Sequence, residues 1–308
     1  MKILIATEKP FSKEAVEGIR EILEKRDHEL ILLEKYNDKK ELLDAVKTVD
    51  AVIIRSDKID KEVLDAAKEL KIVVRAGAGY DNVDLEVATA NNVCVMNTPG
   101  QNSNAVAELV FGMLISLARN GFDGSAGTEL KGKKLGLHAF GYIGKIVAHI
   151  AKGFGMEVYA YSPSLSRNPE RGEEHGVIAV KNPEELYDKS DIVSLHMPAN
   201  ADTKGSINYE LLSRLPEHGI VINTARKEVI NEADMVKIMS ERAKFKYATD
   251  IKPSNHDEMV EKFGKRYLAA AKKCGAQTAE ANMNAGLAAA EQIANFFENG
   301  DEEFRVNK

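Results

Sequence analysis

The feature of the sequence that most constrains its fold is the alternation of short apolar runs with charged, amphipathic segments. In the N-terminal third, the apolar runs are KILIAT (2–7), ELILLE (29–34), DAVIIRS (50–56), KIVVRAG (71–77) and VCVMN (93–97). The segments between them that have helical periodicity are 12–25, 39–47 and 61–68. Runs that are apolar throughout are typical of strands buried on both faces, with the intervening helices covering those faces. The pattern predicts a parallel α/β domain that ends near Asn97.

A second series with the same pattern follows a long apolar helix predicted at 103–119. Its apolar runs are KLGLHAF (134–140), EVYAYS (157–162), IVSLHMP (192–198), GIVINTAR (219–226) and KYATDI (246–251), with a helix from about 142. The predicted fold class is therefore α/β, with two doubly wound (Rossmann or flavodoxin-like) parallel-sheet domains.

The C-terminal end is expected to return to the first domain. A final helix predicted at about 278–298 is followed by FRVNK, which needs a surface to pack on. The predicted division is a substrate-binding domain at 1–98 plus 283–308, and a dinucleotide-binding domain at 99–282.

Composition limits the kinds of partner. The 308 residues include 42 Lys and Arg against 48 Asp and Glu, so the net charge of −6 gives no general attraction to nucleic acid or to an anionic membrane. Two cysteines are too few for a disulfide framework or a Cys-rich metal site, and no metal is expected. The N-terminal segment MKILIATEKP is too short for a signal peptide, and its charges come too early. The longest apolar stretch is interrupted by Glu108, so no membrane-spanning helix is expected. We expect a cytoplasmic protein.

The stretch from Ala139 to Gly144 has the context of a dinucleotide-binding fingerprint, since it lies between a predicted strand and a predicted helix. It matches G-x-G-x-x-G with alanine at the first position. Gly141 would let the backbone of Tyr142 and Ile143 approach a pyrophosphate, and Gly144 would allow close packing of helix on strand. Ala139 would be strained only if its φ must be positive. A glycine-bearing turn in any βαβ unit remains the alternative.

The residue that follows the next strand bears on the choice of cofactor. A ribose-binding carboxylate is expected there, but the sequence has Ser162. Arg167 could meet the 2′-phosphate of NADP or could be a solvated loop charge. NAD is the predicted cofactor, and NADP is not excluded.

Five segments carry a resemblance to a known family. They are IVVRAGAGYDNVD (72–84), MNTPGQNSNAVAELVFGMLISLARN (96–120), ELKGKKLGLHAFGYIGKIVAHIAKGFGMEVYAY (129–161), DIVSLHMP (191–198) and INTARKEVINEADM (222–235). Over nearly its whole length the chain resembles the D-isomer-specific 2-hydroxyacid dehydrogenases, most closely the short D-3-phosphoglycerate dehydrogenases without a C-terminal regulatory domain. The resemblance implies an active site in the cleft between two domains, a homodimer formed through the cofactor domain, and oxidation of 3-phosphoglycerate by NAD in the first step of serine synthesis.

The resemblance also implies roles for individual residues. Arg226 matches the arginine that binds the substrate carboxylate and polarises the reacting carbonyl, and a guanidinium suits both tasks. The alternative is a structural salt bridge at the end of a strand. Asp250 matches the aspartate near the nicotinamide, with a helix cap as the alternative. The other residues expected at the cofactor are Thr224 and Ala225.

Backbone N–H groups and cations of the first domain are expected to bind the substrate. The turn formed by Ala76, Gly77, Ala78 and Gly79 would supply N–H donors to the carboxylate. The cations expected to face a phosphorylated substrate are Arg55, Lys58 and Arg75; each could instead be a surface charge.

The residue in the position of the family's catalytic base is the main departure from the family pattern. Most relatives have a histidine supported by a glutamate, whereas here Lys273 occupies the histidine position and the segment after Asp250 lacks the glutamate. A lysine acts as a base only when partly neutral, so we expect burial and the charge of Arg226 to lower its pKa. Lys272 is the alternative if the register shifts by one, and His256 is a more remote one.

The alternative is that Lys272 and Lys273 are solvated loop cations and that the protein has lost catalysis. Ala271, where many relatives have proline, bears on the geometry of this loop. Two other functions are compatible with the sequence. One is an NAD(P)H-dependent reductase of another 2-keto acid, and the other is a nucleotide-sensing protein that binds cofactor without turnover.

Overall fold

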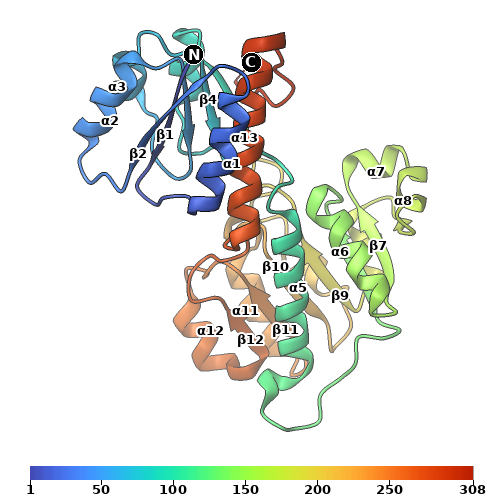
Figure 1. Ribbon diagram of the computed structural model, residues 1–308. Coiled ribbons are helices and arrows are strands. Elements are labelled where there is room, and N and C mark those ends of the chain that lie inside the picture. The colour runs from blue at the N-terminus through green and yellow to red at the C-terminus, as the bar shows by residue number, and fades with distance from the viewer. Residues whose placement is uncertain (308) are drawn as a thin grey trace. The chain divides into compact units, whose positions relative to one another are not determined.

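The computed structural model describes residues 1–307, which divide into two compact units (Figure 1). Unit 1 is Met1–Asn102 together with the C-terminal segment that begins at Ala276, and unit 2 is Ser103–Gly275. The sequence places these boundaries after residues 98 and 282. Each unit has its own sheet and its own core on both sides of that sheet.

Unit 1 contains a five-stranded sheet in which every strand pair is parallel. Its strands are β1 (Lys2–Thr7), β2 (Glu29–Glu34), β3 (Ala51–Ile54), β4 (Ile72–Arg75) and β5 (Cys94–Asn97). The order β2-β1-β3-β4-β5 is that of flavodoxin-like sheets. The order in which successive strands are added to the sheet reverses between β1 and β3, so a ligand crevice is expected at the carboxyl ends of these two strands.

Helices cover both faces of this sheet. The helix α1 (Lys13–Glu24) packs beside α13 (Ala279–Asn299) on one face, and the two lie side by side in Figure 1. The other face is covered by α2 (Lys39–Ala45), η1 (Val46–Thr48), α3 (Lys61–Ala66) and α4 (Leu85–Ala90). Side chains of Ser12, Asp38, Asp60 and Asp84 accept the first backbone N–H groups of their helices, which explains where these helices begin.

The C-terminal tail extends the edge of the unit 1 sheet. Val306 N–H donates to the Val95 carbonyl at 2.8 Å, and Asn307 Oδ1 accepts the Val95 N–H at 2.7 Å. The Asn307 side chain, which is buried, also donates to Val93 and Thr89. The tail therefore satisfies backbone groups that an exposed edge strand would leave unpaired.

Unit 2 contains a seven-stranded sheet, and all of its pairs are parallel. Its strands are β6 (Lys134–His138), β7 (Glu157–Tyr161), β8 (Ile178–Ala179), β9 (Ile192–Leu195), β10 (Ile220–Asn223), β11 (Lys246–Thr249) and β12 (Tyr267–Ala269). Renumbered from β6, their order is the Rossmann order with one further strand. The predicted fold class, two doubly wound α/β units, is confirmed.

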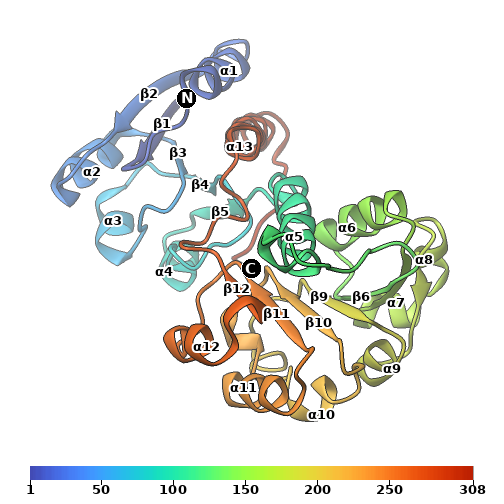
Figure 2. The same cartoon turned by 90° about the horizontal axis from the view of Figure 1, so that it is seen from below.

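Helices also cover both faces of the unit 2 sheet (Figure 2). One face packs against α5 (Ser103–Ala118), which is followed by η2 (Asn120–Phe122), and against α6 (Tyr142–Gly153). The helices on the other face are α9 (Pro183–Asp188), α10 (Tyr209–Leu212), α11 (Glu232–Glu241) and α12 (His256–Phe263). The remaining short helices are α7 (Pro163–Arg167), α8 (Glu170–Glu173), η3 (Lys227–Val229) and η4 (Gly264–Arg266). Among residues 1–307, no helix has both the length and the apolar character needed to cross a membrane.

Candidate functional site

The predicted site residues of unit 2 follow the carboxyl ends of its strands. The loop after β6 runs from Ala139 to Gly144, Arg226 follows β10, Asp250 follows β11, and Lys273 follows β12. Because all these strands are parallel, their carboxyl ends lie at one edge of the sheet. The order reverses between β6 and β9, which is where doubly wound folds bind their ligands.

Within the loop 139–144, the alanine in the first glycine position has the strained conformation. Ala139 has φ of 83°, a region that favours glycine. Gly144 is required by packing, because a Cβ there would lie 2.8 Å from the carbonyl oxygen of Ala139. At Gly141, by contrast, a Cβ would meet nothing within 4 Å. The protein itself therefore does not require glycine at 141.

The loop ends at the N-terminus of α6, which offers free donors. In the described chain, the backbone N–H groups of Tyr142, Ile143 and Gly144 donate to no other protein group. Gly141 is the N-cap residue and has no side chain to satisfy them. Free N–H groups and the positive end of the helix dipole favour an anion at this position.

Ser162 has a structural partner of its own. It follows β7, is buried, and its hydroxyl accepts the Leu165 N–H at 3.1 Å as the N-cap of α7. Arg167, in the last turn of α7, is exposed and makes no hydrogen bond or ion pair with another described residue. The serine that replaces the expected carboxylate therefore starts a helix.

Arg226 lies on a turn that is held by Asn223. Asn223 Oδ1 accepts the Ala225 N–H at 3.0 Å, and its Nδ2 donates to the Arg226 carbonyl at 2.9 Å. The Arg226 guanidinium donates to the Ala225 carbonyl at 2.9 Å, and within residues 1–307 no carboxylate pairs with it. The alternative that Arg226 serves a structural salt bridge is not observed. Most of its donors remain available for an anionic ligand.

Several buried polar atoms near the same edge have no hydrogen-bond partner among residues 1–307. They are Thr224 Oγ1, Ser194 Oγ and both ring nitrogens of His196. Burial lowers the pKa of His138, at the end of β6, to about 4, and lowers that of His196 to about 3, with a further contribution from the charge of His138. Sequence reasoning missed these residues, although Ser194 and His196 interrupt the apolar run IVSLHMP. Buried polar groups without a protein partner are common at ligand sites.

Asp250 is buried and accepts two consecutive backbone N–H groups. Its Oδ1 accepts from Cys274 at 2.7 Å, and its Oδ2 accepts from Gly275 at 3.0 Å. It does not cap the following helix, because α12 begins after Asn255. The helix-cap alternative for Asp250 is therefore wrong, and the carboxylate instead holds the segment next to Lys273.

Lys273 is exposed in the structure, as are Lys272 and Ala271. The expected burial of the Lys273 amine is therefore not provided by unit 2. His256 is partly buried at the start of α12, where its Nδ1 lies 2.9 Å from the hydroxyl of Tyr267, the first residue of β12. Lys272 and Lys273 follow the opposite end of that strand.

In unit 1, Arg55 follows β3 and is held in place by neutral groups. Its guanidinium donates to the carbonyls of Lys9 (3.0 Å) and Pro10 (3.1 Å) and to Asn282 Oδ1, and it lies over the Phe11 ring. Burial lowers its pKa. Arg55 thus connects β3 to α13, and only part of its donor capacity remains for a ligand.

The turn after β4 combines a cation with free N–H groups. Arg75 Nε donates to the Arg55 carbonyl at 3.0 Å. Gly77 has φ of 147°, and a Cβ there would overlap the Arg75 guanidinium. In the described chain the N–H groups of Gly77, Ala78 and Gly79 donate to no protein group, whereas Ala76 N–H is bound to the Ile54 carbonyl.

Lys58 is exposed and makes no hydrogen bond or ion pair with another described residue. It is therefore available to a ligand, but its own contacts do not fix its direction.

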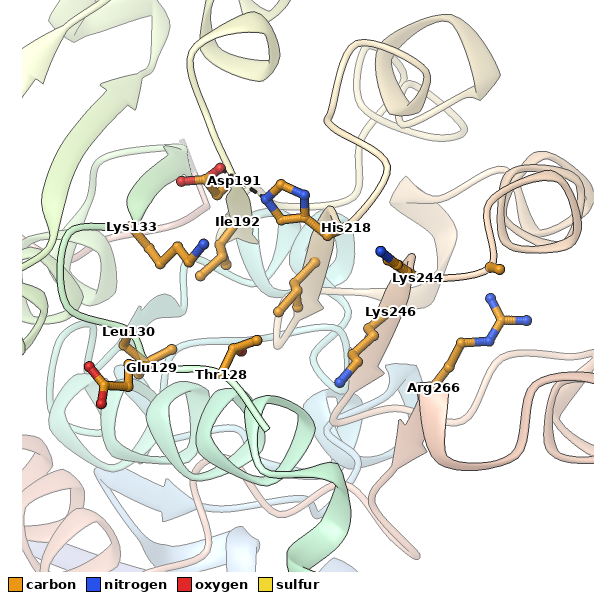
Figure 3. Close-up of a pocket in the computed structure, with 12 residues that line it drawn as sticks. Thr128, Glu129, Leu130, Lys133, Asp191, Ile192, His218, Lys244, Lys246 and Arg266 are labelled. Carbon is orange, nitrogen blue, oxygen red and sulfur yellow. Dashed lines mark ion pairs between the residues drawn. The ribbon is translucent and has the colours of Figure 1, made fainter. Parts of the chain in front are cut away.

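A cavity of about 470 Å³ lies at the opposite edge of the unit 2 sheet, near the amino ends of the strands (Figure 3). Two of its cations have structural roles: Lys246 donates to the Leu117 carbonyl near the end of α5, and Arg266 donates to the Met239 carbonyl in the last turn of α11. The cavity is separate from the edge that carries the predicted site. Within residues 1–307, no cluster of three His, Cys, Asp or Glu could hold a metal ion.

Comparison with solved structures identifies a similar protein. The chain resembles the crystal structure of NAD+-bound 3-phosphoglycerate dehydrogenase of Entamoeba histolytica, with 48% sequence identity and a TM-score of 0.87. The match covers 100% of this chain and 99% of that one.

Two characterised relatives bear different names. The hydroxypyruvate reductase of Thermotoga maritima is 31% identical over 304 residues, which cover 92% of this chain and 95% of that protein. The D-3-phosphoglycerate dehydrogenase of Methanocaldococcus jannaschii is 32% identical over 269 residues, 83% of this chain and 51% of that protein. The chain thus spans about half the length of the latter. The model for the catalytic domain of one family matches residues 5–307, and the chain belongs to that family, the D-isomer specific 2-hydroxyacid dehydrogenases.

Proposed function

We propose that the protein is an NAD-dependent D-3-phosphoglycerate dehydrogenase that oxidises the 2-hydroxyl of 3-phosphoglycerate in the first step of serine synthesis. The observation that carries the proposal is the placement of Arg226 and Lys273 at the same sheet edge as the loop 139–144. Whole-chain similarity to an NAD+-bound 3-phosphoglycerate dehydrogenase supports the choice of substrate.

The residues after β6 fit a dinucleotide. The N–H groups of Tyr142, Ile143 and Gly144 would bind the pyrophosphate, and the open space at Gly141 would let it approach the backbone. Bound NAD would supply the hydride acceptor. Ser162 stands where a carboxylate would have repelled the 2′-phosphate of NADP, so discrimination between the two cofactors should be modest. Thr224 and Asp250 would lie toward the nicotinamide.

Arg226 would bind the substrate carboxylate and stabilise negative charge on the reacting oxygen with the guanidinium donors that the Ala225 carbonyl does not use. The free N–H groups of Gly77, Ala78 and Gly79 would donate to the same carboxylate. Lys273 would take the hydroxyl proton at its Nζ. Because Lys273 is exposed, the proposal requires bound substrate and cofactor to exclude water from this amine.

The phosphate of the substrate would be bound by cations of unit 1. The candidates are Arg55, Lys58 and Arg75, and much of the donor capacity of Arg55 is committed to Lys9, Pro10 and Asn282. We further propose a homodimer. The two free cysteines, Cys94 and Cys274, fit the reducing environment of the cytoplasm.

A second candidate is a reductase of another 2-keto acid. It is favoured by the commitment of Arg55 to protein groups, which leaves fewer cations for a phosphate, and by the similarity to a hydroxypyruvate reductase. Under this candidate, Ser162 and Arg167 would admit NADPH. A third, a nucleotide-sensing protein, would bind cofactor but turn over no hydroxy acid.

One assay separates the three candidates. Purified protein is tested with 3-phosphoglycerate and D-glycerate in the oxidative direction, and with hydroxypyruvate and glyoxylate in the reductive direction, using both cofactors from neutral to alkaline pH. We expect kcat/KM to be highest for 3-phosphoglycerate with NAD, and fluorescence titration to give tighter binding of NAD than of NADP. Higher kcat/KM with an unphosphorylated acid would contradict the substrate assignment, and binding without turnover would favour the sensor.

A further inference from the structure

Three neighbouring strands of unit 2 end in segments that are hydrogen-bonded to one another. The strands β10, β11 and β12 are adjacent in the sheet, and they lead to Arg226, Asp250 and Lys273 respectively. Two buried polar residues, Asn223 and Asp250, make the connections between these segments.

Asn223 fixes the turn that carries Arg226. It is the last residue of β10 and is 1% exposed. Its side chain accepts the Ala225 N–H at 3.0 Å and donates to the Arg226 carbonyl at 2.9 Å, so both ends of the amide are used within this turn. These two bonds determine where the Arg226 backbone leaves the sheet.

The same asparagine connects this turn to Asp250. The backbone carbonyl of Asn223 accepts the Asp250 N–H at 3.0 Å, which continues the β10–β11 ladder one residue past the last paired strand position. The position of the Asp250 backbone is thus tied to the turn of Arg226.

Asp250 then fixes the segment of Lys273. Its two oxygens accept the N–H groups of Cys274 (2.7 Å) and Gly275 (3.0 Å). Residue 275 must be glycine for this contact, since a Cβ there would lie 2.7 Å from Oδ2. A carboxylate is suited to the task because both oxygens are acceptors, whereas an asparagine would place an NH₂ group against one of the two N–H donors.

We propose that Asn223 and Asp250 form one frame that sets the separation of Arg226 and Lys273, and that Asp250 is a positioning residue for Lys273. This inference rests on the proposed function for the roles of Arg226 and Lys273. In this inference Asp250 affects catalysis by holding the 273–275 backbone. That role is distinct from a direct contact between Asp250 and the nicotinamide.

The test compares Asp250→Asn in the wild-type chain and in the Lys273→Ala chain. If Asp250 acts through Lys273, Asp250→Asn lowers kcat by about 10- to 100-fold, the usual scale for groups that orient a reacting residue. In the Lys273→Ala background it should change kcat by no more than about twofold, because the group that it positions is already gone. The dissociation constant of NAD should stay within about threefold of the wild-type value, since the bonds lost belong to the 273–275 segment.

A second measurement does not depend on activity. Hydrogen–deuterium exchange of the full-length chain should show faster exchange at the amides of Cys274 and Gly275 in Asp250→Asn, because their acceptor is altered. Gly275→Ala is the companion variant: it keeps the carboxylate and displaces the segment, so it should also lower kcat. It serves as the test if Asp250→Asn does not fold.

Asp191→Asn is the matched control. Asp191 also accepts a backbone N–H, from Lys134 at 2.9 Å, but at the amino edge of the same sheet. It should leave kcat and the exchange of residues 274 and 275 unchanged.

The outcomes separate this inference from the proposed function. Unchanged exchange at 274 and 275, additive losses in the double variant, or a loss confined to NAD affinity would each overturn the positioning role. Wild-type turnover in Lys273→Ala would instead overturn the assignment of the base, while the exchange measurement would still decide whether the frame exists.

Discussion

The two glycines of the loop 139–144, Gly141 and Gly144, lack a side chain for different physical reasons. Gly144 lies against the carbonyl of Ala139, so its lack of a side chain is a packing requirement of the protein. Gly141 faces open space and has a negative φ, so neither packing nor backbone conformation requires glycine there. We attribute it to the close approach of a pyrophosphate.

Replacing each glycine by alanine should therefore affect a different property: NAD binding at residue 141 and stability at residue 144. Gly141→Ala should change the free energy of unfolding by less than about 1 kcal/mol, since no atom meets the new methyl group. It should nevertheless weaken NAD binding by about tenfold or more, because the methyl occupies the approach of the pyrophosphate. Gly144→Ala should lower stability by about 1–3 kcal/mol through overpacking. Thermal unfolding and fluorescence titration measure both; unchanged NAD affinity in Gly141→Ala would count against a pyrophosphate at this loop.

Lys273 is the residue on which the proposed chemistry depends most. Lys273→Ala should reduce kcat by roughly two to four orders of magnitude, the usual contribution of a general acid or base. NAD affinity should change little. Lys272→Ala is the matched control and should retain most of the activity. Steady-state kinetics of the two variants identify the base, and equal losses in both would contradict the assignment to Lys273.

At the scale of elements, the C-terminal tail stabilises unit 1 through one buried side chain. Asn307 bonds the Val95 N–H, the Val93 carbonyl and the Thr89 hydroxyl. These groups belong to the edge strand β5 and to the segment that leads into it from α4. Without Asn307 the buried backbone groups of Val93 and Val95 would lose this partner.

Truncation of this side chain should therefore be costly. Asn307→Ala should lower the free energy of unfolding by about 2–4 kcal/mol, because two buried backbone groups lose their partners. Glu303→Ala, in the same tail and exposed, should change it by less than about 0.5 kcal/mol. Urea unfolding of both variants measures the difference; equal stabilities would show that the tail does not support β5.

The strands β1 to β7 and β9 to β11 were the most predictable elements because each lies within a continuous apolar run, whereas the short strands β8 and β12 were not predicted. KILIAT and ELILLE coincide with β1 and β2, and the helix predicted at 103–119 is α5 at Ser103–Ala118. The short helices α7 to α10 were not predicted. They span at most six residues, and their starts depend on single caps such as Ser162 and Asn182, which do not distinguish a helix from a turn in sequence.

At the scale of the whole molecule, acid stability should depend on histidines buried in unit 2. Burial keeps the pKa of His138 at about 4, below its ordinary value of 6.5. The neutral form is favoured in the folded state, so this contribution is complete above pH 6.5 and is lost as the pH falls toward 4. For His138 the loss is roughly 3 kcal/mol over that interval.

Stability measured by urea unfolding of the cofactor-free protein should therefore fall between pH 6.5 and 4.5. His138→Gln should show a smaller fall, by about 2 kcal/mol, because the titrating group is absent. His149→Gln, which removes an exposed histidine of α6, is the matched control and should show the same fall as the wild type. A His138→Gln profile parallel to the wild type would show that another group controls acid unfolding.

The sequence by itself determined the two parallel-sheet units, because continuous apolar runs between helical segments can be buried only in such sheets. Local spacing also predicted a dinucleotide-binding turn at 139–144, and the resemblance to the family implied a substrate-binding role for Arg226. Only the tertiary structure showed that Asn223 and Asp250 connect the segments of Arg226 and Lys273 and that Asn307 completes β5. It also showed that the Lys273 side chain is exposed. These features join residues that are distant in the chain, and hydrogen bonds between distant residues leave no periodic pattern in a single sequence.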